Sequence, residues 1–288
     1  PMEAGAALIS SAGSWGLWIL TRGMGCYAAI LLLLCFQQRA LIFPRPSESM
    51  LLDPTKTGGR LLTLEHATAV YFPARAGQNT VLFFHGNGDQ IGGVGAHIGS
   101  KLNAEDGLGF VAVEYPGYGI AHGWPSEESC VAAANAVVEY LIAQPPEGLG
   151  IDPSRLVIFG QSIGCGVALH LAAAGIGTRM VLLSPFTSLV DMATALFPLV
   201  RPALTRFPFV LRDKFNNRAR AKHVSIPTLV IHGRRDEIVP FSQGEKLASE
   251  IPGAKFKAYV MGHNDVFTPP TGRVVIDEIR TFLRVPKL

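Results

Sequence analysis

A serine lies between two glycines in GQSIG at residues 160–164, directly after the apolar run LVIF. This is the G-x-S-x-G pattern, in which a strand turns sharply into a helix and exposes the serine hydroxyl. Side chains at the two glycine positions would clash in so tight a turn, and the turn imposes a strained backbone on the serine. The residues that follow, IGCGVALHLAAA, have a helical pattern. We therefore interpret Ser162 as a nucleophile and not as an ordinary loop residue.

A serine hydroxyl is a weak nucleophile unless a base removes its proton. Where this turn occurs in a parallel sheet, the serine is followed along the chain by an acid and then by a histidine. Of the histidines after Ser162, His263 is the first side chain of a loop that follows an apolar strand pattern, AKFKAYVMG. His232 also ends a strand pattern, but the acids of its loop come after it. The order of residues therefore predicts that His263 is the base.

The acid of this set has to lie between Ser162 and His263 in the chain. Asp236 follows a strand pattern in TLVIHGRRDEIVP, where a carboxylate could orient an imidazole. Glu237 is adjacent and is the alternative, although a neighbouring side chain should point away. The other acids in this interval fall in a predicted cap or on a predicted helix. We predict that Asp236 orients His263.

Acyl transfer also requires backbone N–H groups directed at the oxyanion that develops on the substrate. One donor should be Ile163, which follows the nucleophile. The second should lie in HGNG at residues 85–88, after the strand pattern VLFF, where glycines allow a close approach of the backbone. We assign Asn87, with Gly88 as the alternative, and interpret His85 as a structural residue of the turn.

These groups must be positioned by alternating strands and helices. Short apolar stretches closed by Gly or Pro predict strands within residues 68–74, 79–86, 108–117, 154–162, 178–185, 226–233 and 254–262. Helix patterns occupy residues 126–142, 163–174, 242–250 and 273–284. Such alternation predicts an α/β fold with a mostly parallel central sheet flanked by helices. The predicted site lies beyond the carboxyl ends of the strands.

Residues 190–222 interrupt this alternation. Several prolines and many bulky apolar residues predict short helices inserted as a small helical cap over the site. Phe197, Phe207 and Phe209, together with Leu199 and Leu211, could bind an acyl chain, and the alternative is that they form the interior of the cap. We assign Phe197, Phe207 and Phe209 to substrate binding.

The N-terminal segment carries most of the excess apolar character of the chain. Charged residues are 16% of the sequence, below the ~25% typical of soluble domains. Residues 14–36 contain one charge, Arg22, and Trp15, Trp18 and Tyr27 would suit a membrane interface. We predict that residues 1–44 are a membrane anchor and that residues 45–288 are the catalytic domain. Arg39 and Arg45 outweigh Arg22 and favour a cytoplasmic catalytic domain.

Two other interpretations of this segment stay open. One is a helix packed on the domain, because Arg22 leaves only residues 23–36 without a charge, fewer than the ~20 residues that a spanning helix needs. The other is a cleaved signal, although the residues after the apolar run, QQR, provide no small-residue cleavage site. The apolar character of the segment is common to all three interpretations. They differ in whether the segment enters a membrane, packs on the domain or is cleaved.

Charge and cysteine spacing exclude several classes of partner. The net charge is +3 without a basic block, so no nucleic-acid surface is predicted. The four cysteines show no CxxC or Cys/His spacing, so neither a metal site nor a disulfide framework is predicted. The chemistry proposed for Ser162 needs no cofactor. The oligomeric state is left without a prediction.

Five motifs together resemble one known family, the α/β-hydrolase superfamily of serine hydrolases. They are HGNGD (85–89), EYPGYG (114–119), GQSIG (160–164), HGRRDEIVP (232–240) and GHND (262–265), and the resemblance covers about residues 45–285. It implies Ser162 as nucleophile, Asp236 as acid and His263 as base, with oxyanion donors at Asn87 and Ile163.

Part of the motif set is most similar to the membrane-associated group of this superfamily that includes eukaryotic depalmitoylases. GQSIG, SPFTS (184–188) and GHND carry this similarity, as does the apolar segment that leads into QRALIFPRP. Those enzymes attach through a Cys-rich N-terminus, whereas this chain has only Cys26 and Cys35 inside an apolar stretch. The attachment to membranes would therefore differ between the group and this chain.

The residues and the resemblance lead to one expected activity, the hydrolysis of acyl esters or thioesters through an acyl-enzyme. The substrate would be a lipid or an acylated protein. A protein depalmitoylase and a lipid esterase of the monoacylglycerol or lysophospholipid type both fit. The alternative is a non-catalytic scaffold of the same fold, which predicts a broken triad. Dehalogenase chemistry is excluded, because it needs a carboxylate where Ser162 stands.

Overall fold

The computed structural model describes residues 2–47, 51–207 and 209–284, with side chains from residue 21 onward. The described residues form an eight-stranded sheet in the order β1-β2-β4-β3-β5-β6-β7-β8. The strands are β1 (Arg60–Thr63), β2 (Thr68–Phe72), β3 (Thr80–Phe84), β4 (Gly109–Glu114), β5 (Leu156–Gln161), β6 (Met180–Leu183), β7 (Thr228–Gly233) and β8 (Lys255–Tyr259). β1 and β2 are antiparallel to their neighbours, and the pairs from β4 to β8 are parallel.

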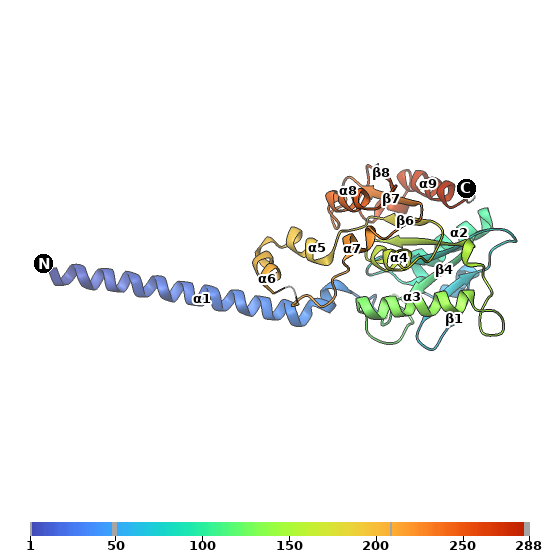
Figure 1. The fold of residues 1–288 in the computed structure, drawn as a ribbon. Helices are drawn as coiled ribbons and strands as arrows, with labels where there is room; N and C mark the ends of the chain where they lie inside the picture. The colour runs from blue at the N-terminus through green and yellow to red at the C-terminus, as the bar shows by residue number, and fades with distance from the viewer. Residues whose placement is uncertain (1, 48–50, 208, 285–288) are drawn as a thin grey trace.

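Helices cover both faces of this sheet (Figure 1). α3 (Glu127–Ile142), α4 (Gly164–Ala173) and α8 (Phe241–Glu250) pack on one face. α2 (Ala96–Asp106) and α9 (Thr271–Arg284) pack on the other. Strand residues alternate between the two layers of core: Leu82 and Phe84 of β3 face the first, and Val81 and Phe83 face the second. Strands buried on both faces are expected to be apolar throughout, as the central strands here are.

Short helical segments complete the chain. They are η2 (Pro54–Thr57), η3 (Ile91–Gly95), η4 (Pro153–Arg155), η5 (Pro198–Val200) and η6 (Asp265–Phe267). η2 and η4 begin at aspartates whose side chains accept from the backbone N–H two residues later, a capping arrangement typical of such turns.

The mostly parallel α/β fold predicted from the sequence is confirmed. All seven predicted strands and all four predicted helices are present, with ends shifted by a few residues. The prediction missed β1 and α2. β1 has only four residues, RLLT, and α2, AHIGSKLNAED, contains few apolar residues, so neither has a strong hydrophobic period.

The connection between β6 and β7 contains the cap. It consists of α5 (Leu189–Leu196), η5, α6 (Arg201–Arg206) and α7 (Asn217–Ala221), in place of a single crossover helix. α5 begins at Ser188, whose hydroxyl accepts from the Asp191 N–H at 3.0 Å. Short helices therefore occupy the interval in which the sequence predicts them.

The N-terminal segment is one continuous helix, α1 (Met2–Ile42), that projects from the domain beside α5 and α6 (Figure 1). Residues Thr21–Ile42 are long and apolar enough to cross a membrane by length and composition, a test that a signal sequence also passes. The end of the helix packs on the domain: Phe43 is 2% exposed and lies in the core, with its ring 6.3 Å from that of Phe215. The side chains of Trp15 and Trp18, predicted at a membrane interface, lie outside the described residues.

Candidate active site

Ser162 occupies a left-handed turn between β5 and α4. Its φ is +51°, and its backbone N–H donates to the carbonyl of Leu183 on β6 at 2.8 Å. A Cβ at Gly160 would come within 2.7 Å of the Gly164 carbonyl oxygen, and one at Gly164 within 2.2 Å of the Phe84 carbonyl oxygen. Only glycine fits at both positions, which is the physical reason for the spacing of the motif. A non-glycine residue in this conformation is strained, as is common at functional sites.

His263 and Asp236 come together beyond the ends of β8 and β7. Nδ1 of His263 lies 2.9 and 2.8 Å from the two carboxylate oxygens of Asp236. The Asp236 side chain is fully buried, and His263 is 6% exposed. Because an ionised carboxylate only accepts hydrogen bonds, Nδ1 must carry the proton, and Nε2 keeps its lone pair. The ring is thus held in the tautomer that can accept a proton at Nε2.

The Asp236 carboxylate is stabilised in its charged form by several donors. Burial raises its pKa, but hydrogen bonds from His232 and His263, the charge of His263 and the Val239 N–H outweigh burial and hold that pKa well below its usual value. Oδ1 accepts from the backbone N–H groups of Ile238 at 3.0 Å and Val239 at 2.7 Å. Asp236 is therefore an anion at neutral pH, as a residue that orients an imidazole should be.

Glu237, the alternative acid, takes a different position. Its Oε2 accepts from the backbone N–H of His263 at 3.3 Å, whereas Asp236 binds the ring. Asp265 accepts from the Gly262 N–H at 3.0 Å on the other side of the same loop. Both carboxylates thus hold the loop that carries His263, without contacting its imidazole.

Ser162 and His263 lie at the same edge of the sheet. Ser162 follows β5, and β6 and β7 separate that strand from β8, which precedes His263. In the part of the chain that the structure describes, no hydrogen bond joins the Ser162 hydroxyl to Nε2 of His263. Such contacts commonly tighten only when substrate binds. The structure thus brings the acid and the base into contact and places the serine at their edge.

The predicted oxyanion donors flank Ser162. Ile163 follows it directly, and Asn87 lies in the loop after β3, the strand adjacent to β5. Among the described residues, neither backbone N–H donates to a carbonyl outside regular secondary structure. The side chain of Asn87 accepts from the Tyr118 hydroxyl at 2.5 Å and donates to the carbonyl of Ile42 at the end of α1. The loop is therefore fixed through side-chain contacts that leave the two N–H groups available.

A buried ion pair supports this loop from beneath. His85 donates from Nε2 to Glu114 at 3.0 Å and from Nδ1 to the Gly86 carbonyl at 2.8 Å. Since both nitrogens face acceptors, the ring is protonated on both. Burial lowers the pKa of His85, but the hydrogen bond and charge of Glu114 outweigh it and raise that pKa overall. His85 contacts the turn, as the sequence predicts, and Glu114 is a partner that the sequence did not suggest.

A second histidine, His232, contacts Asp236. Its Nε2 lies 3.0 Å from the Val239 carbonyl oxygen and 3.4 Å from Asp236 Oδ2, and its side chain is fully buried. Nδ1 has no hydrogen-bond partner and faces Gly244, where a Cβ would come within 2.0 Å of it. The order of residues excludes His232 as the base but does not predict its contact with Asp236. The spacing of four residues between His232 and Asp236 is the signal that could have found it.

The phenylalanines assigned to substrate binding lie on the surface of the cap. Phe197 is 62% exposed, Phe207 47% and Phe209 74%. The rings of Phe207 and Phe209 contact each other edge to face, with 6.0 Å between centroids. All three side chains are thus largely exposed to solvent, and their assignment to an acyl chain stays a prediction.

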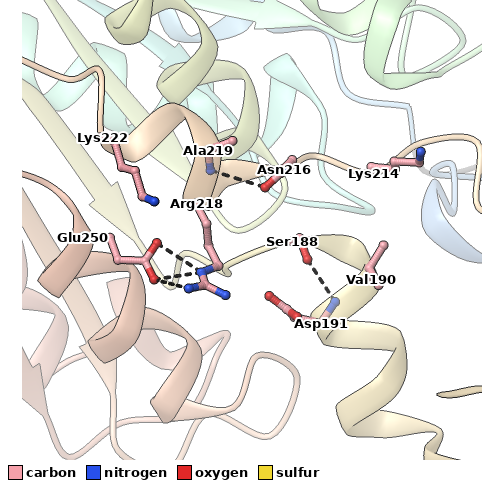
Figure 2. A pocket seen from close by; sticks show the side chains of 9 residues that line it. All are labelled: Ser188, Val190, Asp191, Lys214, Asn216, Arg218, Ala219, Lys222 and Glu250. Carbon is pink, nitrogen blue, oxygen red and sulfur yellow. Dashed lines mark hydrogen bonds and ion pairs between the residues drawn. The ribbon is translucent and has the colours of Figure 1, made fainter. Parts of the chain in front are cut away.

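A cavity of about 370 Å³ lies at the base of the cap (Figure 2), and none of the predicted triad residues lines it. Ser188 and Asp191 of α5, Asn216 and Arg218 near α7, and Glu250 of α8 contribute to its lining. Arg218 is paired with Glu250 at 2.6 Å, which neutralises its charge locally. Among the described residues, no group of three or more His, Cys, Asp or Glu is arranged to hold a metal ion.

Comparisons with known proteins identify the family of the chain and agree with its fold. The model of the alpha/beta hydrolase family matches residues 81–272. The uncharacterized protein Rv2307c of Mycobacterium tuberculosis is 34% identical over 273 residues, which cover 89% of this chain and 90% of that protein. Human alpha/beta hydrolase domain-containing protein 17C is 31% identical over 198 residues, 67% of this chain and 55% of that protein.

The solved structures include similar folds. The esterase Pf2001 of Pyrococcus furiosus superposes with a TM-score of 0.64 at 17% identity, over 83% of this chain and 98% of that one. At this level of identity the similarity extends to the fold alone.

Proposed function

Because this chain belongs to the alpha/beta hydrolase family, we propose that it is a serine hydrolase that cleaves acyl esters or thioesters through an acyl-enzyme. The observation that carries the proposal is the His263–Asp236 pair, 2.8 Å apart, at the strand edge where Ser162 occupies its left-handed turn. Ser162 is the nucleophile, His263 the base and Asp236 the residue that orients it. The members of the set come from three different loops, which is the arrangement expected of a site at the carboxyl edge of a parallel sheet.

In the first half-reaction, the Ser162 oxygen attacks the acyl carbon while Nε2 of His263 takes the hydroxyl proton. The imidazolium that forms is stabilised by the Asp236 carboxylate, which stays ionised because of its donors. The oxyanion accepts hydrogen bonds from the N–H groups of Asn87 and Ile163. His263 then protonates the departing alcohol or thiol, and the carbon–oxygen or carbon–sulfur bond breaks.

In the second half-reaction, water replaces the leaving group. His263 removes a proton from the water, the resulting hydroxide attacks the acyl carbon, and the same N–H groups stabilise the second oxyanion. Collapse breaks the bond to Ser162, which recovers the proton from His263. The acid product leaves, and the site returns to its starting state with no cofactor consumed.

Substrate binding has to bring the Ser162 hydroxyl and His263 together. The apolar cap and α1 support an acyl substrate that resides in a membrane, either a lipid or an acylated protein. The similarity to alpha/beta hydrolase domain-containing protein 17C supports a hydrolase without separating esters from thioesters. Within the proposal, α1 anchors the chain and the catalytic domain, residues 45–288, faces the cytoplasm.

A fluorophosphonate probe tests the proposal, because it labels only an activated serine. We expect Ser162→Ala to abolish labelling and to lower turnover by several orders of magnitude. Ser184→Ala is a matched control: Ser184 directly follows the adjacent strand β6, is buried, and has a φ of +50°. Labelling should persist in this control. Labelling that persists in Ser162→Ala would assign the nucleophile to another residue and overturn the proposal.

A further inference from the structure

The cap exposes large apolar side chains on one stretch of chain. Five of them are more than 45% exposed, and together they define the cap apolar face: Leu196, Phe197, Leu199, Phe207 and Phe209. An ordinary protein surface exposes large apolar residues singly, whereas here they are concentrated on one stretch of chain. The face follows directly from α5 through α6, so it is a continuous part of one insertion.

The neighbouring half of α1 is apolar and exposed as well. In its most apolar stretch, within Thr21–Ile42, only 6% of residues are buried. The exposed apolar residues there are Met24, Ile30, Leu32, Leu33, Phe36 and Leu41. Figure 1 shows α5 and α6 beside this helix, at the same end of the domain. Two apolar surfaces thus lie next to each other.

Hydrogen bonds tie the cap to α1 at both ends of this contact. The Tyr27 hydroxyl donates to the Leu199 carbonyl at 2.9 Å. Gln38 donates to the Val210 carbonyl at 3.0 Å and accepts from the Arg212 N–H at 2.8 Å. Arg39 pairs with the buried Asp213 at 3.1 Å. From Tyr27 to Arg39 the helix rises about 18 Å, so the cap is attached along more than half the thickness of a bilayer core.

We propose that the cap apolar face is a membrane-contacting surface that enters the interfacial layer of a lipid bilayer together with α1. The proposal rests on the anchoring of the chain by α1. Because the cap is bound to the helix between Tyr27 and Arg39, the apolar part of α1 cannot enter lipid without carrying this face to the bilayer. In water the cap apolar face is exposed. At the bilayer its apolar side chains would be buried among the acyl chains of the lipid.

The charges of the cap also favour a lipid bilayer as the partner of this face. Between Asp191 and Asp213 the sequence has no acidic residue, while Arg201, Arg206 and Arg212 are exposed. Arginine can keep its guanidinium at the headgroups while its stem lies along apolar surface. A cationic rim next to an apolar face is typical of surfaces that bind anionic membranes. This combination favours a bilayer over a second copy of the chain, whose cap would carry the same positive charges.

The proposed contact also orients the predicted site. The cap leaves β6 directly after Leu183, which pairs with Gln161, the residue before Ser162. The end of α1 contacts Asn87 of the predicted oxyanion loop. Both membrane-contacting elements therefore start at the carboxyl edge of the sheet, which turns this edge toward the lipid. An acyl chain would reach Ser162 from the bilayer without crossing bulk water.

Site-specific fluorophores test the proposal in the full chain. With Cys26→Ser and Cys35→Ser as background, a label is attached at Leu199→Cys, at Phe209→Cys, or at the control Val274→Cys, which is 54% exposed on α9. The labelled protein is reconstituted into vesicles of phosphatidylcholine and phosphatidylglycerol. We expect doxyl-lipid quenching to be several-fold stronger at positions 199 and 209 than at 274, with weaker quenching by aqueous iodide.

Each other outcome overturns the proposal. Equal quenching at the three positions would mean that the cap apolar face does not contact the bilayer. Protection from iodide without lipid, with a doubled mass in solution, would mean that a second copy covers it. Failure of the full chain to float with vesicles would remove the anchoring on which the proposal rests. Because the label reports depth and not turnover, Ser162→Ala protein should give the same quenching, so failure of the hydrolase proposal would be seen separately.

A second measurement links the face to turnover. Leu196→Ser, at the residue of the cap apolar face that has no assigned contact with an acyl chain, should leave hydrolysis of a short soluble ester unchanged and slow the cleavage of a vesicle-embedded ester several-fold. Val274→Ser should change neither rate. Equal rates of Leu196→Ser and the wild type on the embedded ester would argue against a role of this face at the membrane.

Discussion

Two histidine–carboxylate pairs lie at the same edge of the sheet, and they differ in whether the second ring nitrogen of the histidine faces an acceptor. In the pair of His85 and Glu114, both side chains are buried and both ring nitrogens face acceptors. In the pair of His263 and Asp236, only Nδ1 has a hydrogen-bond partner among the described residues, and the His263 side chain is 7% exposed. The same chemical groups therefore give a charged structural cross-link in one loop and a group with an available lone pair in the other.

Both histidines are paired with a carboxylate, so the difference lies in whether the second ring nitrogen also faces an acceptor. This separates the structural histidine His85 from His263, the histidine proposed as the base. Glu114 also accepts from the Ile91 N–H at 3.2 Å, so the first pair holds the backbone on both sides of the loop that contains Asn87. Asp236 accepts from backbone groups too, but its partner His263 keeps one ring nitrogen for the proposed proton transfer. Substitutions in the two pairs should therefore affect different quantities.

The largest expected effect is on turnover, in the second pair. Asp236→Asn should lower kcat/KM by about 10⁴-fold, because an amide can no longer hold the neutral imidazole in the correct tautomer. Glu237→Gln, which alters a contact with the backbone of His263 only, is the matched control and should cost a few-fold at most. Hydrolysis of a short soluble ester measures both. If Glu237→Gln were the more damaging change, the acid would have been assigned to the wrong carboxylate.

The next effect is on stability, in the first pair. Glu114→Gln should reduce the free energy of unfolding by about 3 kcal/mol, because it leaves a buried histidine without its counter-charge. Urea denaturation at pH 6 measures it, and the exposed Glu128→Gln on α3 should be within about 0.5 kcal/mol of wild type.

The pH dependence of this loss follows from the direction of the His85 shift. The pKa of His85 is raised in the folded state, so the pair stabilises fully below the unfolded value of about 6.5 and loses its contribution as pH rises through the folded pKa. The cost of Glu114→Gln should therefore shrink as pH rises above about 6.5. A cost that is constant from pH 5 to pH 9 would mean that His85 is not charged.

The smallest effect is expected at His232, which touches Asp236 without touching the reacting groups. His232→Gln should lower kcat about tenfold with little change in KM, the loss expected from one hydrogen bond to a charged group. The exposed His223→Gln is the control. The loss should also be smaller than in Asp236→Asn, and in a double variant it should not add to that change, because both act through one carboxylate. Additive losses would show that His232 acts elsewhere.

How much the sequence predicts depends on how far apart the interacting residues are. The elbow at Ser162 was predictable from the G-x-S-x-G pattern between a strand pattern and a helix pattern, although only the clash that requires Gly160 is local, and the clash that requires Gly164 is with Phe84 on β3. The contact between His263 and Asp236 was predictable from chain order and strand ends, since parallel strands bring their carboxyl ends to one edge. β1 and α2 were missed because their own residues carry no strong hydrophobic period, and contacts elsewhere in the fold hold them in place.

The sequence alone determined the alternating α/β pattern, the positions of the strand ends and the identity of the residues that follow them, because backbone geometry and apolar burial are local preferences of the chain. The tertiary structure alone decided which of these residues meet. Glu114 reaches His85 from 29 residues away because β4 pairs with β3, and Gln38 and Arg39 meet the cap across more than 170 residues. Such contacts depend on strand order and on the path of α1, and these depend on the packing of the whole chain and not on any short stretch of it.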